Sequence, residues 1–161
     1  MASTKKVAGL AFLVVLIVCA TAYVFTAPYT RIAGVRIGGT TTAPPADFST
    51  AYKGTIGLIK TGGFPPFVVH VVLVPFKHGF ITATRPDGGY WSKRARIAPD
   101  GYVRHGDATF AMKATEVVGD ERLPYLSAWG GPDLDRRLSG GVIVGESEPL
   151  REWQVFLWTP R

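Results

Sequence analysis

The pattern of hydrophobic and polar positions along this chain changes abruptly after residue 27. Residues 7–27 read VAGLAFLVVLIVCATAYVFTA and contain no charged side chain. An α-helix rises about 1.5 Å per residue, so this segment would be roughly 31 Å long, which matches the hydrocarbon core of a bilayer. The pattern therefore predicts a retained, single-pass transmembrane helix over residues 7–27, preceded by a short N-terminus at residues 1–6.

Two other interpretations of this apolar segment stay open. Lys5 and Lys6, followed by the apolar run and the small residues 20–22, also fit a secretory signal with a cleavage site. Residues 16–19 resemble a bacterial lipoprotein box, although a valine stands where a small residue is expected before the cysteine. Length favours the anchor, because the apolar run continues past residue 22.

The charges that flank the segment indicate its orientation. Lys5 and Lys6 adjoin its start, whereas Arg31 and Arg36 follow it at a greater distance. Positive charges close to a transmembrane helix favour the cytoplasmic side, so the two lysines favour a cytoplasmic N-terminus. The rest of the chain is then expected in the periplasm or outside the cell.

Beyond residue 27 the pattern consists of short β-branched runs separated by glycine and proline. Residues 28–50 are rich in Gly, Thr and Pro, which predicts a tether with one short strand at 34–37. Strands are then expected at 55–60, 67–77, 80–84, 142–145 and 153–159, with a hairpin over 101–118, and short helices at 90–97, 121–129 and 133–138. The fold class predicted for residues 51–161 is mainly β, a small antiparallel split β-barrel of about six strands with short helices.

The same pattern predicts which side chains face the core. Residues 67–74 are nearly continuous in apolar character, as in a central strand buried on both faces. His70 on this strand is expected to be a hydrogen-bonded core residue. In the hairpin, Tyr102 and Phe110 are expected to face inward and Arg104 outward.

Composition and missing motifs narrow the function. The formal net charge of +6 suits an acidic partner such as anionic lipid or a phosphate-bearing ligand, or else a solvated basic surface, and nucleic acid is not expected. The single cysteine, Cys19, lies in the apolar segment, which excludes thiol catalysis in the following domain. The chain has no GxSxG, HExxH, CxxC or GxxxxGK[ST] motif, and its three histidines lack metal-ligand spacing, so we predict no metal site.

The best candidate site is a cluster of hydroxyl, cationic and aromatic residues between residues 82 and 104. Thr82 and Thr84 end a strand and Arg85 follows them. The further members are Tyr90, Trp91, Lys93, Arg94, Arg96 and Arg104. Hydroxyls and cations at a strand end suit a phosphate, and an aromatic pair suits a planar ring. Cations that only cover a sheet edge or contact anionic lipid would give the same pattern.

The order of these elements resembles the split β-barrel superfamily of flavin and deazaflavin proteins. Within it, residues 82–117, TATRPDGGYWSKRARIAPDGYVRHGDATFAMKATEV, are similar to the deazaflavin-dependent nitroreductase-like branch. Trp91 and Pro99 stand at matching places in and after the short helix, and the final WQVFLWTPR resembles the closing strand of the family. The resemblance covers residues 53–161 and implies FMN or a deazaflavin as cofactor.

The resemblance also implies which residues would bind that cofactor. Its phosphate would contact Thr82, Thr84, Arg85 and Lys93. Its ring would lie near Lys60 and Thr61, with Trp91 in the same site. No catalytic residue is assigned, because the chain lacks an acid–base dyad and the cofactor would have to supply the chemistry.

Two classes of function follow from these observations. The first is a membrane-anchored oxidoreductase that binds a flavin or deazaflavin and reduces a lipophilic acceptor such as a quinone. The second is a non-catalytic accessory subunit without a cofactor, whose helix docks in a larger membrane complex while the barrel braces the soluble face of that complex. A carrier of lipid or another small ligand is a third alternative. Membrane lipid, subunits of a complex and a second copy of the chain are the partners to test.

Overall fold

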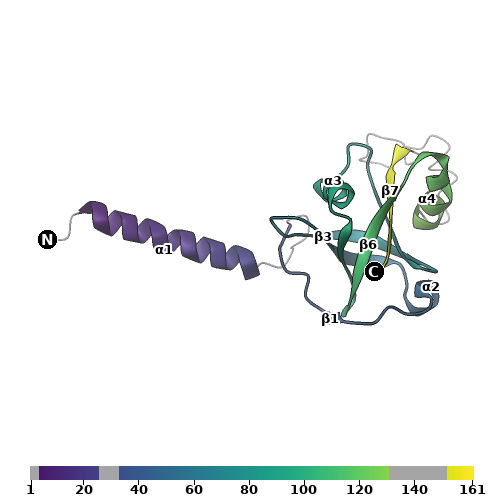
Figure 1. The fold of residues 1–161 in the computed structure, drawn as a ribbon, viewed down its shortest axis with the longest axis horizontal. Helices are drawn as coiled ribbons and strands as arrows, with labels where there is room; N and C mark the ends of the chain where they lie inside the picture. The colour runs from purple at the N-terminus through teal and green to yellow at the C-terminus, as the bar shows by residue number, and fades with distance from the viewer. Residues whose placement is uncertain (1–3, 26–32, 131–151) are drawn as a thin grey trace.

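The computed structural model describes residues 4–25, 33–130 and 152–161, and it contains one long helix and one barrel (Figure 1). The helix, α1 (Thr4–Phe25), has 22 residues, and the side chains from Lys6 to Tyr23 are all exposed. It is long and apolar enough to cross a membrane. The helix predicted from the hydrophobic pattern is therefore confirmed, while residues 26 and 27 lie outside the described part of the chain.

Six antiparallel strands close the barrel. They are β2 (Thr55–Thr61), β3 (Phe67–Phe76), β4 (Gly79–Thr84), β5 (Asp100–His105), β6 (Ala108–Val117) and β7 (Gln154–Pro160). The strand order is β6-β5-β2-β3-β4-β7, and β6 also pairs with β7, so the sheet closes on itself. Closure leaves a single interior for the apolar side chains, and it confirms the mainly β barrel predicted from the sequence.

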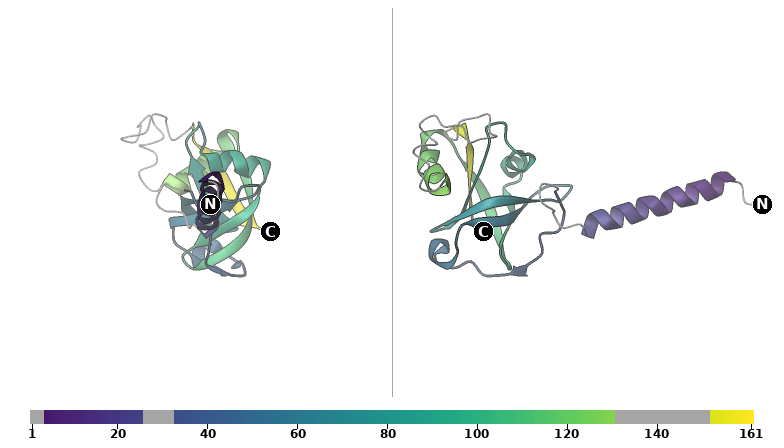
Figure 2. Two further views of the ribbon diagram at one scale, coloured as in Figure 1. Left: turned by 90° about the vertical axis from the view of Figure 1, so that its left-hand side faces the viewer. Right: turned by 180° about the vertical axis from the view of Figure 1, so that it is seen from behind.

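Short helices and one small strand complete the fold. They are β1 (Thr40–Thr41), which pairs in parallel with β6, α2 (Phe48–Ala51), α3 (Tyr90–Ile97), the 3-10 helix η1 (Gly119–Arg122) and α4 (Leu123–Gly130). The helix predicted at 90–97 is confirmed, whereas the one predicted at 121–129 is a 3-10 turn followed by α4. The helix predicted at 133–138 and the strand at 142–145 lie outside the described residues. Figure 1 and the right-hand view of Figure 2 place α4 at the end of the barrel away from α1.

The barrel interior is dominated by aromatic side chains. Trp158 on β7 is fully buried, and its Nε1 donates a hydrogen bond of 3.0 Å to Thr82 Oγ1. Phe48 packs edge-on against Phe80 and Phe110, with ring centroids 5.0 and 5.3 Å away. Phe48 belongs to α2, which lies within the segment expected to be a tether. Residues 33–51 are therefore packed on the barrel instead of only leading to it.

The outer face of β3 corrects two predictions. Even-numbered residues of this strand point away from the barrel interior. Val68 is buried where Gly34 pairs with it, and Val74 packs against the cluster around Leu126 of α4. His70 and Val72 lie between these two covered positions and are exposed. The strand is therefore not buried on both faces along its length, and His70 is not a core residue.

Tyr102 on β5 corrects a third prediction. It is 39% exposed, whereas Val103 beside it is fully buried and pairs with buried Phe110. Side chains alternate along a strand, so Tyr102 must share the outward face with Arg104. The inward residue of β5 at this level of the barrel is Val103.

Candidate functional site

A groove of about 580 Å³ lies between the outer face of the barrel and the segment 33–42, which we call the strap. The strap is the part of the chain that first reaches the barrel after α1. The groove is lined by Arg36, Ile37, Gly38 and Gly39 of the strap, Ile56, Gly57 and Leu58 of β2, His70 of β3, and Arg104 and Gly106 of the β5–β6 hairpin. It is an apolar strip with basic residues at its sides.

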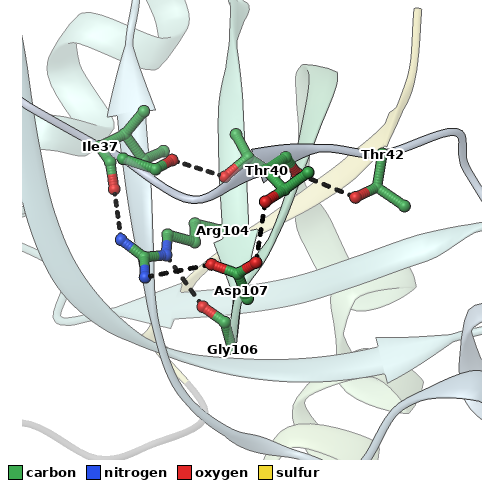
Figure 3. Close-up of polar contacts among 8 residues, drawn as sticks. Ile37, Thr40, Thr42, Arg104, Gly106 and Asp107 are labelled. Atoms are coloured by element: carbon green, nitrogen blue, oxygen red, sulfur yellow. Dashed lines mark hydrogen bonds and ion pairs between the residues drawn. The ribbon is translucent and has the colours of Figure 1, made fainter.

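Arg104 holds the strap against the hairpin (Figure 3). Its Nη1 donates to the carbonyl oxygen of Ile37 at 3.0 Å, and its Nε donates to the carbonyl oxygen of Gly106 at 2.9 Å. Its Nη2 lies 3.9 Å from Asp107 Oδ1, and Asp107 Oδ2 accepts a hydrogen bond from Thr40 Oγ1 at 2.8 Å. Arg104 therefore connects three backbone or side-chain partners at one side of the groove.

Two glycines let the strap come this close to the hairpin. Gly38 and Gly39 have φ angles of 63° and 76°, a left-handed conformation that side chains disfavour. A Cβ on Gly38 would lie 2.8 Å from Arg104 Nη1, and one on Gly39 would lie 2.5 Å from Thr109 Oγ1. Thr109 Oγ1 in turn donates to the carbonyl oxygen of Gly38 at 2.8 Å. The strap is thus fixed by contacts on both sides of its glycine pair.

Two cross-strand pairs of β2 and β3 lie at the floor of the groove, and Ile56, Leu58 and His70 of these pairs line it. Leu58 is opposite His70, and Ile56 is opposite Val72. Ile56 and Val72 are 66% and 42% exposed, so this pair presents apolar area to solvent. Outward-facing strand positions on a barrel are ordinarily polar, so an exposed pair of β-branched apolar residues indicates a surface that contacts another molecule.

Three of the residues expected to bind a cofactor are buried in the barrel interior or at its end. Thr82 is fully buried and accepts the Trp158 hydrogen bond. Trp91 is 8% exposed and packs edge-on against Phe156, with ring centroids 5.1 Å apart. Thr61 is buried, and its Oγ1 accepts a 3.2 Å hydrogen bond from Arg94 Nε.

The other four expected residues lie on the surface. Lys60 places its Nζ 6.0 Å from the ring centroid of Tyr102, outside the barrel. Thr84 is half-buried, and Arg85 is exposed, with its Nε 4.0 Å from Asp87 Oδ1. Lys93 is exposed and lines a second hollow. Thr84 and Arg85 thus lie next to each other just before α3. The seven residues predicted to bind a cofactor do not form one site, because they are distributed over the barrel interior, its outer face and α3.

Arg94 has a structural role that its place in the basic cluster did not reveal. It is 9% exposed, and its Nη2 donates to the carbonyl oxygens of Gly62 and Pro65 at 2.8 and 2.6 Å. Its Nη1 lies 3.3 Å from the hydroxyl of Tyr90. Arg94 thereby fastens α3 to the β2–β3 turn.

Two ionisable groups near these elements have shifted pKa values. The hydrogen bond to Glu116 raises the pKa of Arg96 above its ordinary value, and the Nε of Arg96 donates to Glu116 Oε2 at 2.6 Å. At the start of α2, the hydrogen bond from the Ser49 hydroxyl lowers the pKa of Asp47. Both shifts favour the charged forms. The Arg96–Glu116 pair also joins α3 to β6, whereas the Asp47–Ser49 bond caps the start of α2.

The sequence reasoning missed the groove residues Arg36, Ile56 and His70, and the exposed Val72 beside them. One signal could have revealed the exposed face of β3. His70 is the polar residue in the apolar run 67–74, and residues 68, 70, 72 and 74 share one face of the strand. Within the described parts of the chain, no group of three or more His, Cys, Asp or Glu side chains is placed to hold a metal ion. Neither protein-family models nor curated proteins give a match to this chain.

Proposed function

We propose that this protein is a non-catalytic accessory subunit of a membrane complex, with α1 in the bilayer and a barrel of the split type beside it. The groove beneath the strap is then the docking site for an apolar, acidic segment of the partner. The observation that carries this proposal is the exposed pair Ile56 and Val72 in the groove region, flanked by basic side chains.

The composition of the groove favours a protein partner. Protein interfaces commonly have an apolar centre and a polar rim. Ile56 and Leu58 supply the centre, and the exposed Val72 extends it from its position opposite Ile56, while Arg36 and His70 are exposed beside it. Positive charge at the rim favours acidic residues of a partner and disfavours basic ones.

The strap makes this site largely preformed. Arg104 and the glycine pair hold its backbone in place before any partner binds. A preformed site loses less conformational entropy when it is occupied than a flexible one does. This suits a subunit whose barrel is to stay in one position on a larger complex.

The chain length between helix and barrel limits where the partner lies. Eight residues lie between Phe25, the end of α1, and Gly34, which pairs with β3, so nine Cα-to-Cα steps join the two. Nine such steps span at most about 32 Å when the chain is fully extended. The docking segment therefore belongs to a membrane protein or to a subunit held close to the bilayer.

A photo-crosslinking amino acid at position 70 tests this proposal. In native membranes, we expect full-length protein with the crosslinker at His70 to give one discrete adduct, and Arg36→Glu in the same chain to reduce its yield. The matched control carries the crosslinker at Thr115, which is exposed on β6 across the barrel from β2 and β3. Equal adduct yields at positions 70 and 115 would contradict a docking groove, and an adduct between two copies of the chain would replace the proposed partner with a homodimer.

The flavin or deazaflavin function is the second candidate, and one observation favours it. Thr84 and Arg85 precede α3, whose N-cap residue Gly89 makes no side-chain capping bond. Backbone N–H groups at an uncapped helix start, next to a hydroxyl and a guanidinium, are groups that can bind phosphate. An absorbance spectrum of the detergent-purified protein tests this function, since bound flavin or deazaflavin absorbs in the visible or near ultraviolet.

A matched pair of variants makes that test specific. If the cofactor function holds, Arg85→Ala with Lys93→Ala should weaken FMN or deazaflavin binding by about two orders of magnitude, because two charge-assisted contacts are lost. Lys113→Ala, which removes an exposed cation of β6, should leave the affinity unchanged. Absence of saturable binding by the wild-type protein would exclude this candidate.

A further inference from the structure

Two large apolar side chains of the barrel domain are almost fully exposed to solvent. Phe64 in the β2–β3 turn is 91% exposed and Ile97 at the end of α3 is 86% exposed, the two highest values among the large hydrophobic residues described. Both line one hollow of about 380 Å³, together with Tyr90 and Lys93. We call Phe64, Tyr90, Lys93 and Ile97 the turn–helix face.

The turn that carries Phe64 is held in place by a buried cation. Arg94 donates to the carbonyl oxygens of Gly62 and Pro65, on either side of Phe64 in the sequence. Its guanidinium carbon also lies 5.8 Å from the ring centroid of Phe67. The exposed ring of Phe64 is therefore presented by a fastened turn.

The charges beside these apolar groups are positive. Lys93 is exposed between Tyr90 and Ile97 on α3. Arg94 donates its hydrogen bonds to hydroxyl and carbonyl oxygens, which carry no formal charge. Apolar tips next to an interfacial tyrosine and basic groups are the combination that binds the headgroup region of an anionic bilayer.

The turn–helix face lies where the chain from the membrane helix meets the barrel. Gly34 pairs with Val68, which follows Phe64 by only four residues. Figure 1 and the right-hand view of Figure 2 show α3 nearer than α4 to the end of the barrel from which α1 extends. Since at most about 32 Å of chain separates Phe25 from Gly34, this face is within reach of the bilayer that would hold α1.

We propose that the turn–helix face rests on the bilayer, with Phe64 and Ile97 inserted at the interface and Lys93 against anionic headgroups. This contact fixes the rotation of the barrel about the tether and leaves the groove beneath the strap free for a protein partner. It rests on the proposed function only in that α1 is taken to be in the membrane.

Site-specific labels in partner-free nanodiscs test this proposal. The full-length Cys19→Ser protein would carry a nitrobenzoxadiazole label at Phe64→Cys or Ile97→Cys, in phosphatidylcholine with about 30% phosphatidylglycerol. The matched control is Val118→Cys, because Val118 is also an exposed apolar residue, 66% accessible, and precedes η1 and α4. We expect dithionite, which stays in water, to bleach the labels at positions 64 and 97 several-fold more slowly than the label at 118.

A charge reversal tests the role of Lys93. Lys93→Glu should raise the bleaching rates at positions 64 and 97 toward the control rate in anionic nanodiscs, because the carboxylate repels the headgroups. Equal bleaching rates at positions 64, 97 and 118 would overturn membrane contact, and slow rates unaffected by Lys93→Glu would overturn the headgroup contact of Lys93. The nanodiscs contain no protein partner, so failure here leaves the crosslinking result at His70 to decide the docking groove separately.

Discussion

Arg104 on β5 donates a 3.0 Å hydrogen bond to the carbonyl oxygen of Ile37, a residue 67 positions earlier in the chain. This bond joins the segment that comes from the membrane helix to a hairpin in the middle of the barrel domain. The strap and the hairpin are therefore held together by a contact between residues far apart in the chain.

Replacing Arg104 should release the strap without unfolding the barrel. Arg104→Ala removes the bonds to Ile37 and Gly106, and hydrogen bonds from charged donors contribute about 1.5–3 kcal/mol each when they are not exposed. Because Arg104 is only partly buried, we expect a smaller total loss, about 1–3 kcal/mol. Hydrogen exchange should then become faster at the amides of Thr40 and Thr42, which bond to Asp107 and Thr109.

The control for this prediction is Arg85→Ala. Arg85 is exposed and its Nε lies 4.0 Å from Asp87, so its removal should change stability by about 0.5 kcal/mol or less. Unchanged exchange at Thr40 and Thr42 in Arg104→Ala would show that the glycine pair alone holds the strap.

Two phenylalanines in the same domain should differ strongly in the stability that is lost when each is truncated to alanine. Phe48 is 1% exposed and packs on Phe80 and Phe110, so Phe48→Ala should lower the free energy of unfolding by about 3–5 kcal/mol. Phe64 is 91% exposed, and Phe64→Ala should change it by about 0.5 kcal/mol or less in detergent. Urea unfolding followed by tryptophan fluorescence measures both, and equal losses would mean that α2 does not seal the barrel.

The carboxyl of Asp47 should titrate below its ordinary pKa of 3.8, chiefly because the hydroxyl of Ser49 donates to it. A lowered pKa in the folded state favours folding at pH values above the ordinary pKa, and this contribution is lost as the pH falls through the folded-state pKa. Ser49→Ala should move the pKa of Asp47 upward toward 3.8 and reduce that acid-range dependence. A carboxyl NMR titration of both proteins measures the shift, and an identical pKa in Ser49→Ala would contradict the assigned cause.

The orientation predicted from the lysines before α1 can be tested in intact cells. In a Cys19→Ser background, Val118→Cys should react with a membrane-impermeant maleimide if the barrel is on the periplasmic or outer side, once the outer envelope is made permeable. A cysteine at position 2, before α1, should react only after lysis. The reverse pattern of labelling would place the barrel in the cytoplasm.

Local sequence signals were sufficient for most elements of the fold. The helix at Tyr90–Ile97 was predicted within its observed bounds, and β2, β3 and β4 agree to within one residue at each end. These elements are bounded by Gly or Pro, which act on the backbone of their own neighbourhood. The segment 33–51 was misjudged because its contacts, such as Phe48 with Phe80, join residues far apart in the chain.

The candidate sites were much less accessible to sequence reasoning. A run of cations between residues 82 and 104 suggested one phosphate site, but Arg94, Arg96 and Arg104 each bond a different part of the surface. Which acceptor a cation finds depends on the strand register and on the direction in which its side chain points. Neither quantity is encoded in the spacing of the charges.

By itself, the sequence determined that this protein has one apolar helix long enough for a bilayer and a mainly β domain, because both follow from the periodicity of hydrophobic positions. Only the tertiary structure decided that the strap is fastened by Arg104, that His70 lies in an open groove, and that Phe64 and Ile97 share one exposed face. The reason is physical: exposure depends on what covers a residue, and the covering segments come from distant parts of the chain.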